Sequence, residues 1–438
     1  MPNLAPSSIL VMKFGGASLK DATSIQQAVS LIETYTSEPL VIVVSAMGKM
    51  TQALEDLALA AKMGRKQEAQ ERLYQIHHFH QSHAQQLFPD SLAPVHERIA
   101  IYLNEISSII EGLLLLGEFP DRIYDRIVAF GELLSSQLVF SWLEKNNPAW
   151  KWVDARDLIL TDDQSRQAQV LWQPTQDQIR KTITPFLQQG HSVIIQGFIG
   201  RSASGKTTTL GKEGSDYSAA LFSAALGAKE QIVWKDVPGV MSEDPRISAQ
   251  AEVLPVIRYD QAITMTRFGA SVIHPKTIQP LRNEGIPLRV KCFLKPELPG
   301  TLISEQGPDH LPWSLLKNGL TLLELRTKDY GYLESENINR FLQSFQNAGL
   351  QELVMWVSGL DLCLITEATP AQCKMYLSSI EAWANGNATY SIALRTFSAS
   401  HRLPPEPENK IYALNLGEIT HWVYRLEETE ISTTSKIA

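Results

Sequence analysis

The feature that most constrains the fold of this chain is the alternation of short β-branched runs with long helical patterns. Buried strands are predicted at residues 8–14, 40–45, 192–198, 231–234 and 288–291. Between them apolar residues recur at helical spacing, as at Ile25, Ala28, Val29 and Ile32. Strands that alternate with helices form mainly parallel sheets covered on both faces, so we predict an α/β fold, a three-layer αβα sandwich. Such sheets bind ligands beyond the carboxyl ends of their strands.

The pattern changes after residue 303. Residues 304–312 (SEQGPDHLP) are polar and rich in turn formers, which indicates a linker. Beyond it, predicted strands and helices follow a smaller βαββαβ order, typical of a ferredoxin-like α+β unit. We therefore predict one domain at 1–303 and a second at 313–438. The second holds one such unit and a short remainder, in which residues 411–426 are expected to add a strand and a helix.

Composition limits the classes of partner. The chain has 438 residues and a net charge of −8, which argues against nonspecific binding to nucleic acid or to an anionic membrane. Its three cysteines lie far apart without metal-ligand spacing, as expected for a reduced cytoplasmic protein. The first apolar run lacks a preceding basic region, so we expect a strand rather than a signal peptide. Uninterrupted apolar runs such as 40–44 are too short to span a bilayer.

A first candidate anion site follows the strand at 8–14. This strand leads Lys13 into a loop with Gly15 and Gly16, whose backbone N–H groups can approach an anion closely. Lysine suits such a site because it is a compact charge on a long stem. A tight strand-to-helix turn with a surface lysine would explain the same pattern.

A second candidate site covers residues 197–216 (GFIGRSASGKTTTLGKEGSD). Gly200 to Thr207 formally spells the phosphate loop G-x-x-x-x-G-K-[ST], which requires a helix starting at its Gly-Lys pair. Three threonines and two further glycines follow instead, and these residues disfavour a helix. We expect the helix to begin at Ser215 and Asp216, so that its amino end forms an anion site. Asp216 could cap this helix, orient a nearby lysine, or do both.

Three further segments carry weaker signals. Residues 235–246 (KDVPGVMSEDPR) place a Pro-Gly turn after a predicted strand, which fits a surface turn or a nucleotide contact. Residues 130–132 (FGE) and 268–270 (FGA) are predicted as glycine turns. Glu132 would then lie in the first turn of a helix at 133–143, either for helix-end electrostatics or as the ligand of a substrate ammonium.

Taken in this order, the segments resemble the amino-acid kinase family, and most closely its aspartate kinases. The matching runs are KFGGAS (13–18), VVSAMGKMT (43–51), FGE (130–132), GFIG with TTTLGKEGSDYSAA (197–220), KDVPGVMSEDPR (235–246) and FGASVIHP (268–275). The combination of VPGV, DPR and GSD favours aspartate kinases over acetylglutamate, glutamate or uridylate kinases. The resemblance spans roughly residues 9–303 and implies the amino-acid kinase fold. The region after it resembles ACT regulatory domains, which implies a homo-oligomer, with a dimer formed through this region.

The resemblance also implies an activity. ATP would donate its γ-phosphoryl group to the β-carboxylate of L-aspartate, the first step of lysine, threonine and methionine synthesis. Mg²⁺ is expected to travel with ATP, held mainly by phosphates and water. The implied catalytic residues are Lys13 and Asp216. The implied substrate-binding residues are Ser45, Thr51, Glu132, Lys212 and Ser215. The implied ATP-binding residues are Lys13, Gly15, Gly16, Ser18, Lys235, Asp236, Met241, Arg246, Ser271 and Val272.

The chain departs from the family pattern at four places. Lys212 replaces an arginine expected to clamp a substrate carboxylate, and lysine has no comparable fork. Ser271 stands where a phosphate-neutralising lysine is expected, a role that Lys276 could take. Ala17 replaces a threonine, and the C-terminal region is short for two ACT units. Two alternatives to an aspartate kinase therefore stay open: a regulatory homologue that binds ATP or an amino acid, and a kinase of another acidic amino acid.

Overall fold

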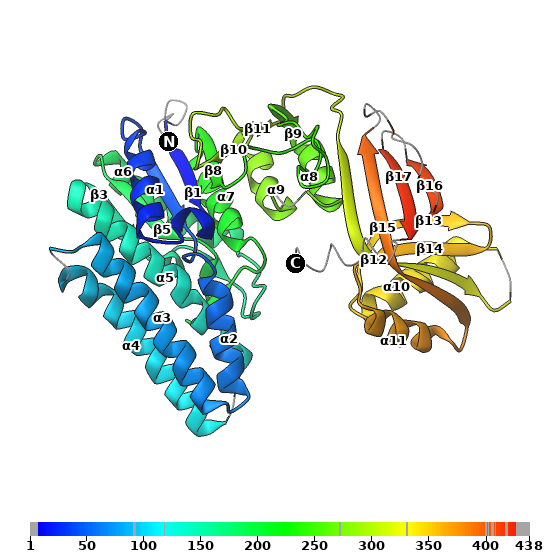
Figure 1. The fold of residues 1–438 in the computed structure, drawn as a ribbon, viewed down its shortest axis with the longest axis horizontal. Coiled ribbons are helices and arrows are strands. Elements are labelled where there is room, and N and C mark those ends of the chain that lie inside the picture. The colour runs from blue at the N-terminus through cyan, green and yellow to red at the C-terminus, as the bar shows by residue number, and fades with distance from the viewer. Residues whose placement is uncertain are drawn as a thin grey trace. The chain divides into compact units, whose positions relative to one another are not determined.

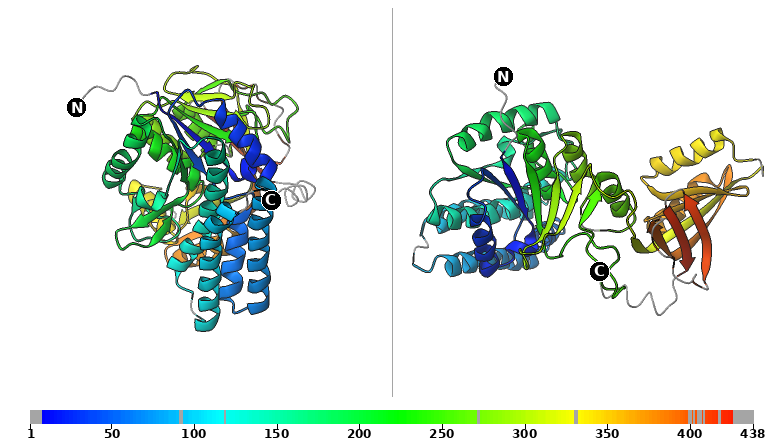
Figure 2. Two further views of the ribbon diagram at one scale, coloured as in Figure 1. Left: turned by 90° about the vertical axis from the view of Figure 1, so that its left-hand side faces the viewer. Right: turned by 90° about the horizontal axis from the view of Figure 1, so that it is seen from above.

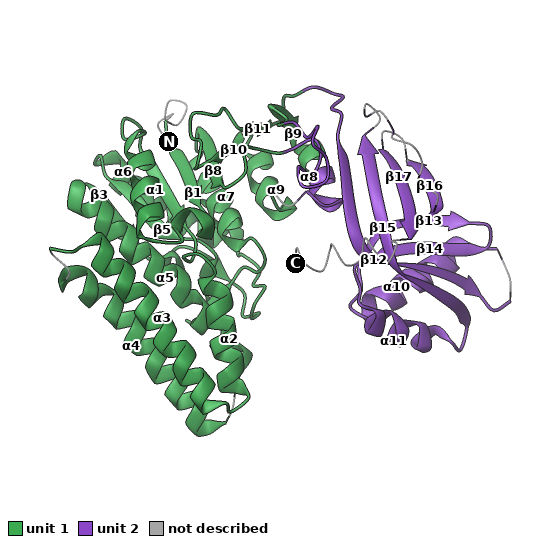
Figure 3. Cartoon of the chain, viewed as in Figure 1, with its two compact units in different colours: residues 1–240, 253–263, 272–307 green, residues 241–252, 264–271, 308–438 purple. Residues whose placement is uncertain are grey.

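The computed structural model describes residues 8–90, 93–117, 119–270, 273–329, 332–398, 401, 403, 407, 409–416 and 419–425. The chain forms two compact units, coloured separately in Figure 3. The first comprises Met1–Val240, Val253–Ile263 and Val272–Gly307, and the second comprises Met241–Glu252, Thr264–Ser271 and Pro308–Ala438. No local pattern indicated that 241–252 and 264–271 group with the second unit. The predicted limits at 303 and 313 and the regulatory role of the second domain stay predictions.

The first unit is built on an eight-stranded sheet in the order β3-β5-β2-β1-β8-β10-β11-β9. Five strands, all in parallel pairs, occupy the five predicted positions: β1 (Leu10–Phe14), β2 (Leu40–Val44), β5 (Ser192–Gln196), β8 (Glu230–Lys235) and β10 (Leu288–Cys292). β3 (Trp150–Val153) and β9 (Val256–Arg258) are also parallel to their neighbours, whereas β11 (Thr301–Ser304) is antiparallel to β10. The predicted mainly parallel sheet is confirmed. β1 and β2 are buried along their whole length, because helices cover both faces.

Two groups of helices form the outer layers of the sandwich (Figures 1 and 2). α1 (Ala22–Glu33) and α5 (Asp121–Asn146) belong to one layer, and α6 (Trp172–Gln188) and α7 (Gly214–Leu226) to the other. α9 (Pro275–Asn283) packs on α7. The smaller elements are the 3-10 turns η1 (Gly16–Leu19) and η2 (Ala155–Asp157), the short sheet of β4 (Leu160–Thr161), β6 (Ile199–Ser202) and β7 (Thr207–Thr209), and α8 (Tyr259–Arg267).

Three long helices extend the layer of α5: α2 (Met50–Lys62), α3 (Lys66–Leu87) and α4 (Ala93–Leu116). By length and composition alone, α4 could cross a membrane. This corrects the sequence-based statement that the apolar runs are too short, because that statement considered uninterrupted runs. The signal is weak, since core helices of soluble proteins meet the same criterion. One face of α4, which includes Ile99, Leu103 and Ile106, is buried.

The second unit contains an antiparallel sheet in the order β13-β14-β12-β15-β17-β16. Its elements are β12 (Ser314–Thr327), α10 (Ser335–Asn347), β13 (Glu352–Ser358), β14 (Asp361–Thr366), α11 (Pro370–Ile380), β15 (Ala384–Ser398), β16 (Lys410–Leu416) and β17 (Ile419–Arg425). The first four strands and two helices form the predicted ferredoxin-like βαββαβ unit, with Phe341, Phe345 and Tyr376 in its core. The helix expected within 411–426 is wrong: both elements there are strands, and β17 pairs along β15.

Candidate active site

Lys13 lies near the carboxyl end of the central strand β1, level with Val43 of β2 and Val233 of β8. Its side chain is 10% exposed, and its Nζ lies 2.5 Å from Oδ1 of Asp216. Lys235, the last residue of β8, places its Nζ 3.1 Å from Oδ2 of the same carboxylate. One buried carboxylate therefore holds two ammonium groups at the carboxyl ends of the central strands.

The charge balance of this cluster suits an anionic ligand. Burial alone would raise the pKa of Asp216, but the ammonium groups of Lys13 and Lys235 outweigh it and hold the pKa of this carboxyl below its ordinary value. One carboxylate and two ammonium groups leave one net positive charge in a largely buried place. Phosphate groups are the ligands that such a site attracts.

The Gly15–Gly16 turn brings the backbone close to this cluster. A Cβ on Gly15 would lie 3.3 Å from Nζ of Lys13, and one on Gly16 would lie 2.6 Å from O of Gly48. Glycine is required at position 16, because a side chain would collide with backbone. Ser18 is buried, and its hydroxyl donates to O of Gly15 at 2.8 Å, so it closes the turn η1. Contacts of this turn with ATP stay a prediction.

Asp216 lies in the first turn of α7, which begins at Gly214, one residue before the predicted start. The N-cap position belongs to Glu213, so the capping role considered for Asp216 is wrong, and its carboxylate pairs with the lysines. The rejection of the phosphate-loop match is confirmed, because β6 and β7 form an antiparallel hairpin where that loop would need a helix.

Glu132 lies in the middle of the long helix α5, so the predicted glycine turn at 130–132 is wrong. A Cβ on Gly131 would lie 2.8 Å from Cβ of Ala46, which shows that this glycine allows α5 to approach the loop after β2. The N–H of Ala46 donates to Oε1 of Glu132 at 3.2 Å. Helix packing, rather than a turn, positions this carboxylate.

The second carboxylate oxygen of Glu132 is available to a ligand. Oε2 is buried and has no hydrogen-bond partner among the residues that the structure describes. Burial raises the pKa of Glu132 to about 8, although the N–H of Ala46 and the charge of Lys13 act in the opposite direction. A buried oxygen without a donor is costly, and a ligand ammonium would satisfy it.

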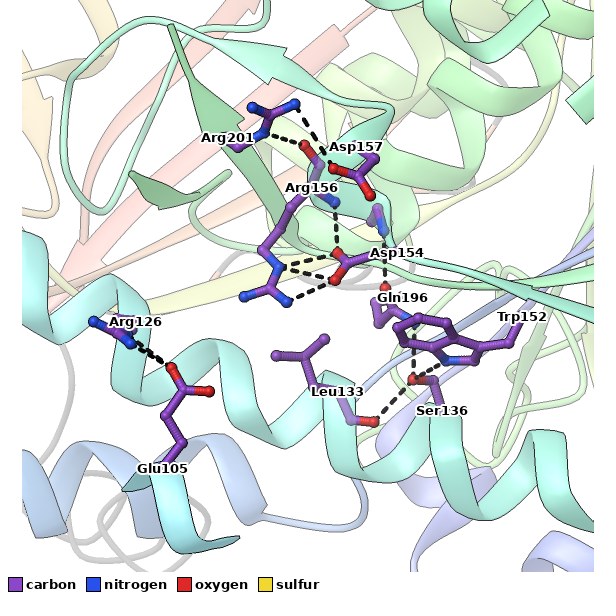
Figure 4. Close-up of polar contacts among 11 residues, drawn as sticks. Glu105, Arg126, Leu133, Ser136, Trp152, Asp154, Arg156, Asp157, Gln196 and Arg201 are labelled. Atoms are coloured by element: carbon purple, nitrogen blue, oxygen red, sulfur yellow. Dashed lines mark hydrogen bonds and ion pairs between the residues drawn. The ribbon is translucent and has the colours of Figure 1, made fainter. Parts of the chain in front are cut away.

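A largely buried polar network centred on Ser136, one turn after Glu132, fixes α5 against the sheet. Figure 4 shows its side chains. The amide of Gln196 donates to Oγ of Ser136 at 2.9 Å and accepts from the N–H of Ala155 at 2.9 Å. The indole N–H of Trp152 also donates to Oγ of Ser136, at 3.0 Å. Because all these groups are paired, the network positions α5 rigidly. Sequence patterns offered no signal for it, since its members are dispersed along the chain.

The other four predicted substrate-binding residues lie on separate elements. The N–H of Ser45 donates to O of Phe14 at 3.1 Å, and its carbonyl accepts from Oγ of Ser135 at 2.5 Å. Thr51 lies in the first turn of α2. Ser215 is buried at the start of α7, so close to Gly197 that a Cβ there would lie 2.5 Å from Cβ of Ser215. Lys212 is exposed in the preceding turn.

Phe198 was not predicted from the sequence to be a site residue. It adopts a left-handed backbone with a φ of 69°, and its N–H donates to Oγ of Ser218 at 2.9 Å. A Cβ on Gly214 would lie 2.7 Å from Cδ2 of Phe198, so the ring packs on the start of α7. Left-handed residues other than glycine concentrate at functional sites, but no local pattern announced this one.

The remaining residues predicted to bind the nucleotide lie in different parts of the chain. Asp236 is exposed directly after Lys235. Met241 and Arg246 lie in the segment that groups with the second unit, where the guanidinium of Arg246 pairs with Asp244 at 2.7 Å. Ser271 and Val272 lie outside the described residues. Lys276 is exposed in the first turn of α9, where its N–H donates to Nδ1 of His274 at 3.2 Å.

The residues present offer little direct support for a metal ion. No group of three or more His, Cys, Asp or Glu side chains is placed to hold one in the described part of the chain. Asp216, the carboxylate of the lysine–aspartate cluster, is already paired with two lysines. A metal would therefore depend on oxygen ligands from phosphate and water, as Mg²⁺ commonly does with nucleotides.

Comparison with known proteins agrees with this geometry. The amino acid kinase family matches residues 8–292. Lysine-sensitive aspartokinase 3 of Escherichia coli is 32% identical over 324 residues, covering 73% of this chain and 70% of that protein. Aspartokinase 1, chloroplastic, of Arabidopsis thaliana is 32% identical over 323 residues, which is 72% of this chain but 56% of the relative's length. The crystal structure of E. coli aspartokinase III in complex with aspartate and ADP (R-state) matches with a TM-score of 0.83 at 25% identity, covering 97% of each chain.

A mainly parallel sheet with a lysine–aspartate cluster at the carboxyl ends of its strands defines a phosphate-handling α/β protein. The chain belongs to the amino acid kinase family, and the relatives it matches there include aspartokinases.

Proposed function

We propose that this chain is an aspartate kinase, which transfers the γ-phosphoryl group of ATP to the β-carboxylate of L-aspartate. The products are 4-phospho-L-aspartate and ADP, and the reaction is the first step of lysine, threonine and methionine synthesis. One observation carries the proposal: Asp216 pairs with two lysines, and the charge of one of them, Lys13, acts on the buried Glu132. The second oxygen of Glu132 has no hydrogen-bond partner within the described part of the chain. A phosphate site thus adjoins an ammonium site.

The chemistry requires few groups from the protein. An oxygen of the β-carboxylate attacks the γ-phosphorus, and the bond to the β–γ bridging oxygen breaks, so that ADP leaves with the electron pair. A carboxylate is already ionised, so no general base is needed, and alignment with charge neutralisation supplies most of the rate. Lys13 neutralises the transferring group, and Asp216 fixes its ammonium. Mg²⁺ bound to ATP would be held by phosphate oxygens and water, and it would supply further neutralisation of the phosphate charge.

The amino acid is recognised at its polar ends. Glu132 accepts hydrogen bonds from the α-ammonium through Oε2, and the hydroxyls of Ser45, Thr51 and Ser215 line the rest of the amino-acid site. Lys212 offers a single ammonium to the α-carboxylate. The E. coli relative of similar fold was crystallised with aspartate and ADP, which supports this choice of substrates.

The nucleotide contacts combine two sets of residues. Lys235 and the turn of Gly15, Gly16 and Ser18 contact the phosphates. Asp236, Met241, Arg246, Ser271 and Val272 contact the remainder of ATP. Lys276 provides the positive charge that a lysine at position 271 would have supplied. Its place in the first turn of α9 suits this role, because the amino end of a helix also favours an anion nearby.

The proposal also covers the cell compartment and the oligomeric state of the protein. The protein acts in the cytoplasm as a homo-oligomer, with a dimer formed through the ferredoxin-like unit. That unit is the regulatory, ACT-like part of the chain.

The test is an ATP-dependent hydroxamate assay with aspartate, glutamate and N-acetylglutamate as acceptors, and with Lys13→Ala as the control. Hydroxamate formed from aspartate by the unmodified chain, and lost in the control, supports the proposal. Hydroxamate from another acceptor would identify a different kinase. ATP binding without an acyl phosphate from any acceptor would support the regulatory alternative, which the replacement of an arginine by Lys212 favours.

A further inference from the structure

The strand β7 leads into the turn of Lys212, and two neighbouring threonines tie it to different elements. Thr208 and Thr209 are both buried. The hydroxyls of Thr208 and Thr161 share a hydrogen bond of 2.7 Å, which joins β7 to β4. The hydroxyl of Thr209 donates to Oδ1 of Asp125 at 2.8 Å, which joins β7 to α5. Side chains alternate along a strand, so the two threonines face opposite ways.

Asp125 is a fully buried carboxylate that joins α5 to a second segment as well. The N–H of Arg166, in the loop of residues 162–170, donates to both of its oxygens, at 2.9 and 3.0 Å. Burial raises the pKa of Asp125, and the hydrogen bonds from Arg166 and Thr209 act in the opposite direction. A buried carboxylate is costly unless its oxygens accept hydrogen bonds, so both donors contribute to its place in the fold.

The backbone of Arg166 is held against its local preference. Its φ of 68° is left-handed, which is costly for a residue with a Cβ. Its side chain lies on the same helix, with Cζ 4.0 Å from the centroid of the Tyr124 ring. Both the backbone and the side chain of Arg166 therefore contact α5, and these contacts maintain the conformation of the loop.

This loop packs in turn on the residues that follow β7. The N–H of Ala168 donates to O of Thr209 at 2.9 Å. A Cβ on Gly211 would lie 3.3 Å from O of Arg166. The turn after β7 is thus fixed twice by one carboxylate, directly through the hydroxyl of Thr209 and indirectly through the loop.

The helix that carries Asp125 also carries the proposed ligand of the substrate ammonium. Asp125 lies seven residues before Glu132, so both carboxylates are on the same face of α5, about 10 Å apart along its axis. Lys212, the proposed contact of the α-carboxylate, follows Thr209 by three residues. The hydrogen bond between Asp125 and Thr209 therefore connects the two segments that would hold the two ends of the amino acid.

We infer that Asp125 is a positioning residue for the amino-acid site, because it holds the turn of Lys212 at a set distance from Glu132 through the hydroxyl of Thr209. The inference rests on the proposed function for the identity of the amino acid. Asp125 acts through these residues. Its effect is on alignment, and a displacement of about 1 Å in a reacting site can cost about 100-fold in rate.

Thr209→Val tests this inference, because valine keeps the shape of the side chain and removes its hydroxyl. By calorimetry, the Kd for L-aspartate should rise about 10-fold, as for one weakened charge-assisted contact. The Kd for ATP should change less than about twofold, because its contacts lie elsewhere. In steady-state kinetics the KM for aspartate should rise by a similar factor, with kcat changed less than about threefold.

Thr208→Val is the matched control. It removes a buried hydroxyl from the neighbouring residue of the same strand, so it should lower the unfolding midpoint about as much as Thr209→Val. Its partner is on β4 rather than α5, so the Kd for aspartate should stay unchanged. Thr209→Ser keeps the hydroxyl and should restore the aspartate affinity of the unmodified chain.

Asp125→Ala tests whether the two residues act as one unit. In this background Thr209→Val should cause no further rise in the Kd for aspartate, because the hydroxyl has already lost its acceptor. If Asp125→Ala does not fold, the comparison of the two threonine positions decides alone.

Equal rises in the Kd for aspartate in Thr208→Val and Thr209→Val, or no rise in Thr209→Val, would overturn the inference and leave Asp125 a structural role. A further loss in the double variant would overturn it as well, and so would absence of aspartate binding to the unmodified chain. Aspartate binding that depends on the Thr209 hydroxyl, but without acyl phosphate formation, would leave the inference standing and contradict the kinase proposal alone.

Discussion

Nζ of Lys13 lies 2.5 Å from Oδ1 of Asp216, although one residue belongs to the central strand and the other to the first turn of a helix on a distant segment. The contact joins the two segments that the sequence marked as candidate anion sites. It also fixes the direction of an otherwise flexible side chain. We regard this pair as the centre of the proposed phosphoryl-transfer site.

Replacing Asp216 with asparagine should abolish most activity while keeping the shape of the side chain. The ammonium groups of Lys13 and Lys235 would then lack a buried counter-charge, and Lys13 would lose its fixed position. We expect kcat to fall by about 10²- to 10³-fold, the range for a lost electrostatic contact at a reacting centre. Steady-state kinetics measures the effect, with Asp56→Asn as a surface control, since Asp56 pairs with the half-exposed Arg72. A fully active Asp216→Asn variant would mean that the lysines need no counter-charge.

The ligand-free protein should lose stability as the pH rises. Burial raises the pKa of Glu132 from its ordinary value of 4.5 to about 8. Between these values the folded state binds more protons than the unfolded state, so the free energy of unfolding decreases with rising pH. Glu132→Gln should flatten this dependence and be the more stable protein at pH 8. Urea unfolding between pH 5 and pH 9 measures it, with Glu144→Gln on the same helix as the control. Parallel pH profiles for all three proteins would show that Glu132 is ionised throughout.

Aspartate binding should depend on the same group. An ionised Glu132 pairs better with an ammonium than a protonated one, so binding at pH 7 should release protons. Calorimetry in buffers of different ionisation enthalpy counts them. Proton release that persists undiminished in Glu132→Gln would assign it to another residue.

Gly131→Ala should separate α5 from the loop after β2. The new methyl group would lie 2.8 Å from Cβ of Ala46 and 3.3 Å from Cδ1 of Leu54. Overpacking of this kind costs about 1–3 kcal/mol of stability, and the displaced Glu132 should raise the KM for the amino acid. Gly112→Ala in α4 is the matched control, because among the described residues the added Cβ would meet no heavy atom within 4 Å beyond the local helix backbone and its chain neighbours. There alanine should stabilise the helix by about 0.5–1 kcal/mol. Equal effects of the two substitutions would contradict the packing role of Gly131.

Lys212→Arg should lower the KM for aspartate, because a guanidinium binds a carboxylate through two parallel hydrogen bonds. Position 212 is exposed, so the substitution should leave the unfolding midpoint unchanged. Initial rates over a range of aspartate concentrations test it. An unchanged or higher KM would mean that residue 212 does not contact the substrate.

Local patterns predicted those parts of the fold that local chemistry determines. The buried strands and the start of α7 were readable because β-branched runs, glycines and threonines restrict the backbone over a few residues. Gly131 was misread as a turn, because glycine serves equally where two backbones pack closely. β17 was misread as a helix, because its pairing with β15 is decided by distant residues.

The candidate site was predictable in its charges but not in its geometry. Lys13, Glu132 and Asp216 were identified from their motifs. The grouping of 241–252 and 264–271 with the second unit, and the left-handed conformations of Phe198 and Arg166, depend on tertiary contacts that leave no local mark. Long-range packing therefore accounts for most of what sequence reasoning missed.

The most direct test of the central claim is chemical trapping of the acyl phosphate. Borohydride reduces an acyl phosphate to an alcohol, so a phosphorylated β-carboxylate of aspartate yields homoserine, whereas a phosphorylated α-carboxylate yields 3-amino-4-hydroxybutanoate. The account predicts homoserine that requires ATP, aspartate and an intact Lys13. The α-product, or no reduced product from a chain that binds both substrates, would contradict it.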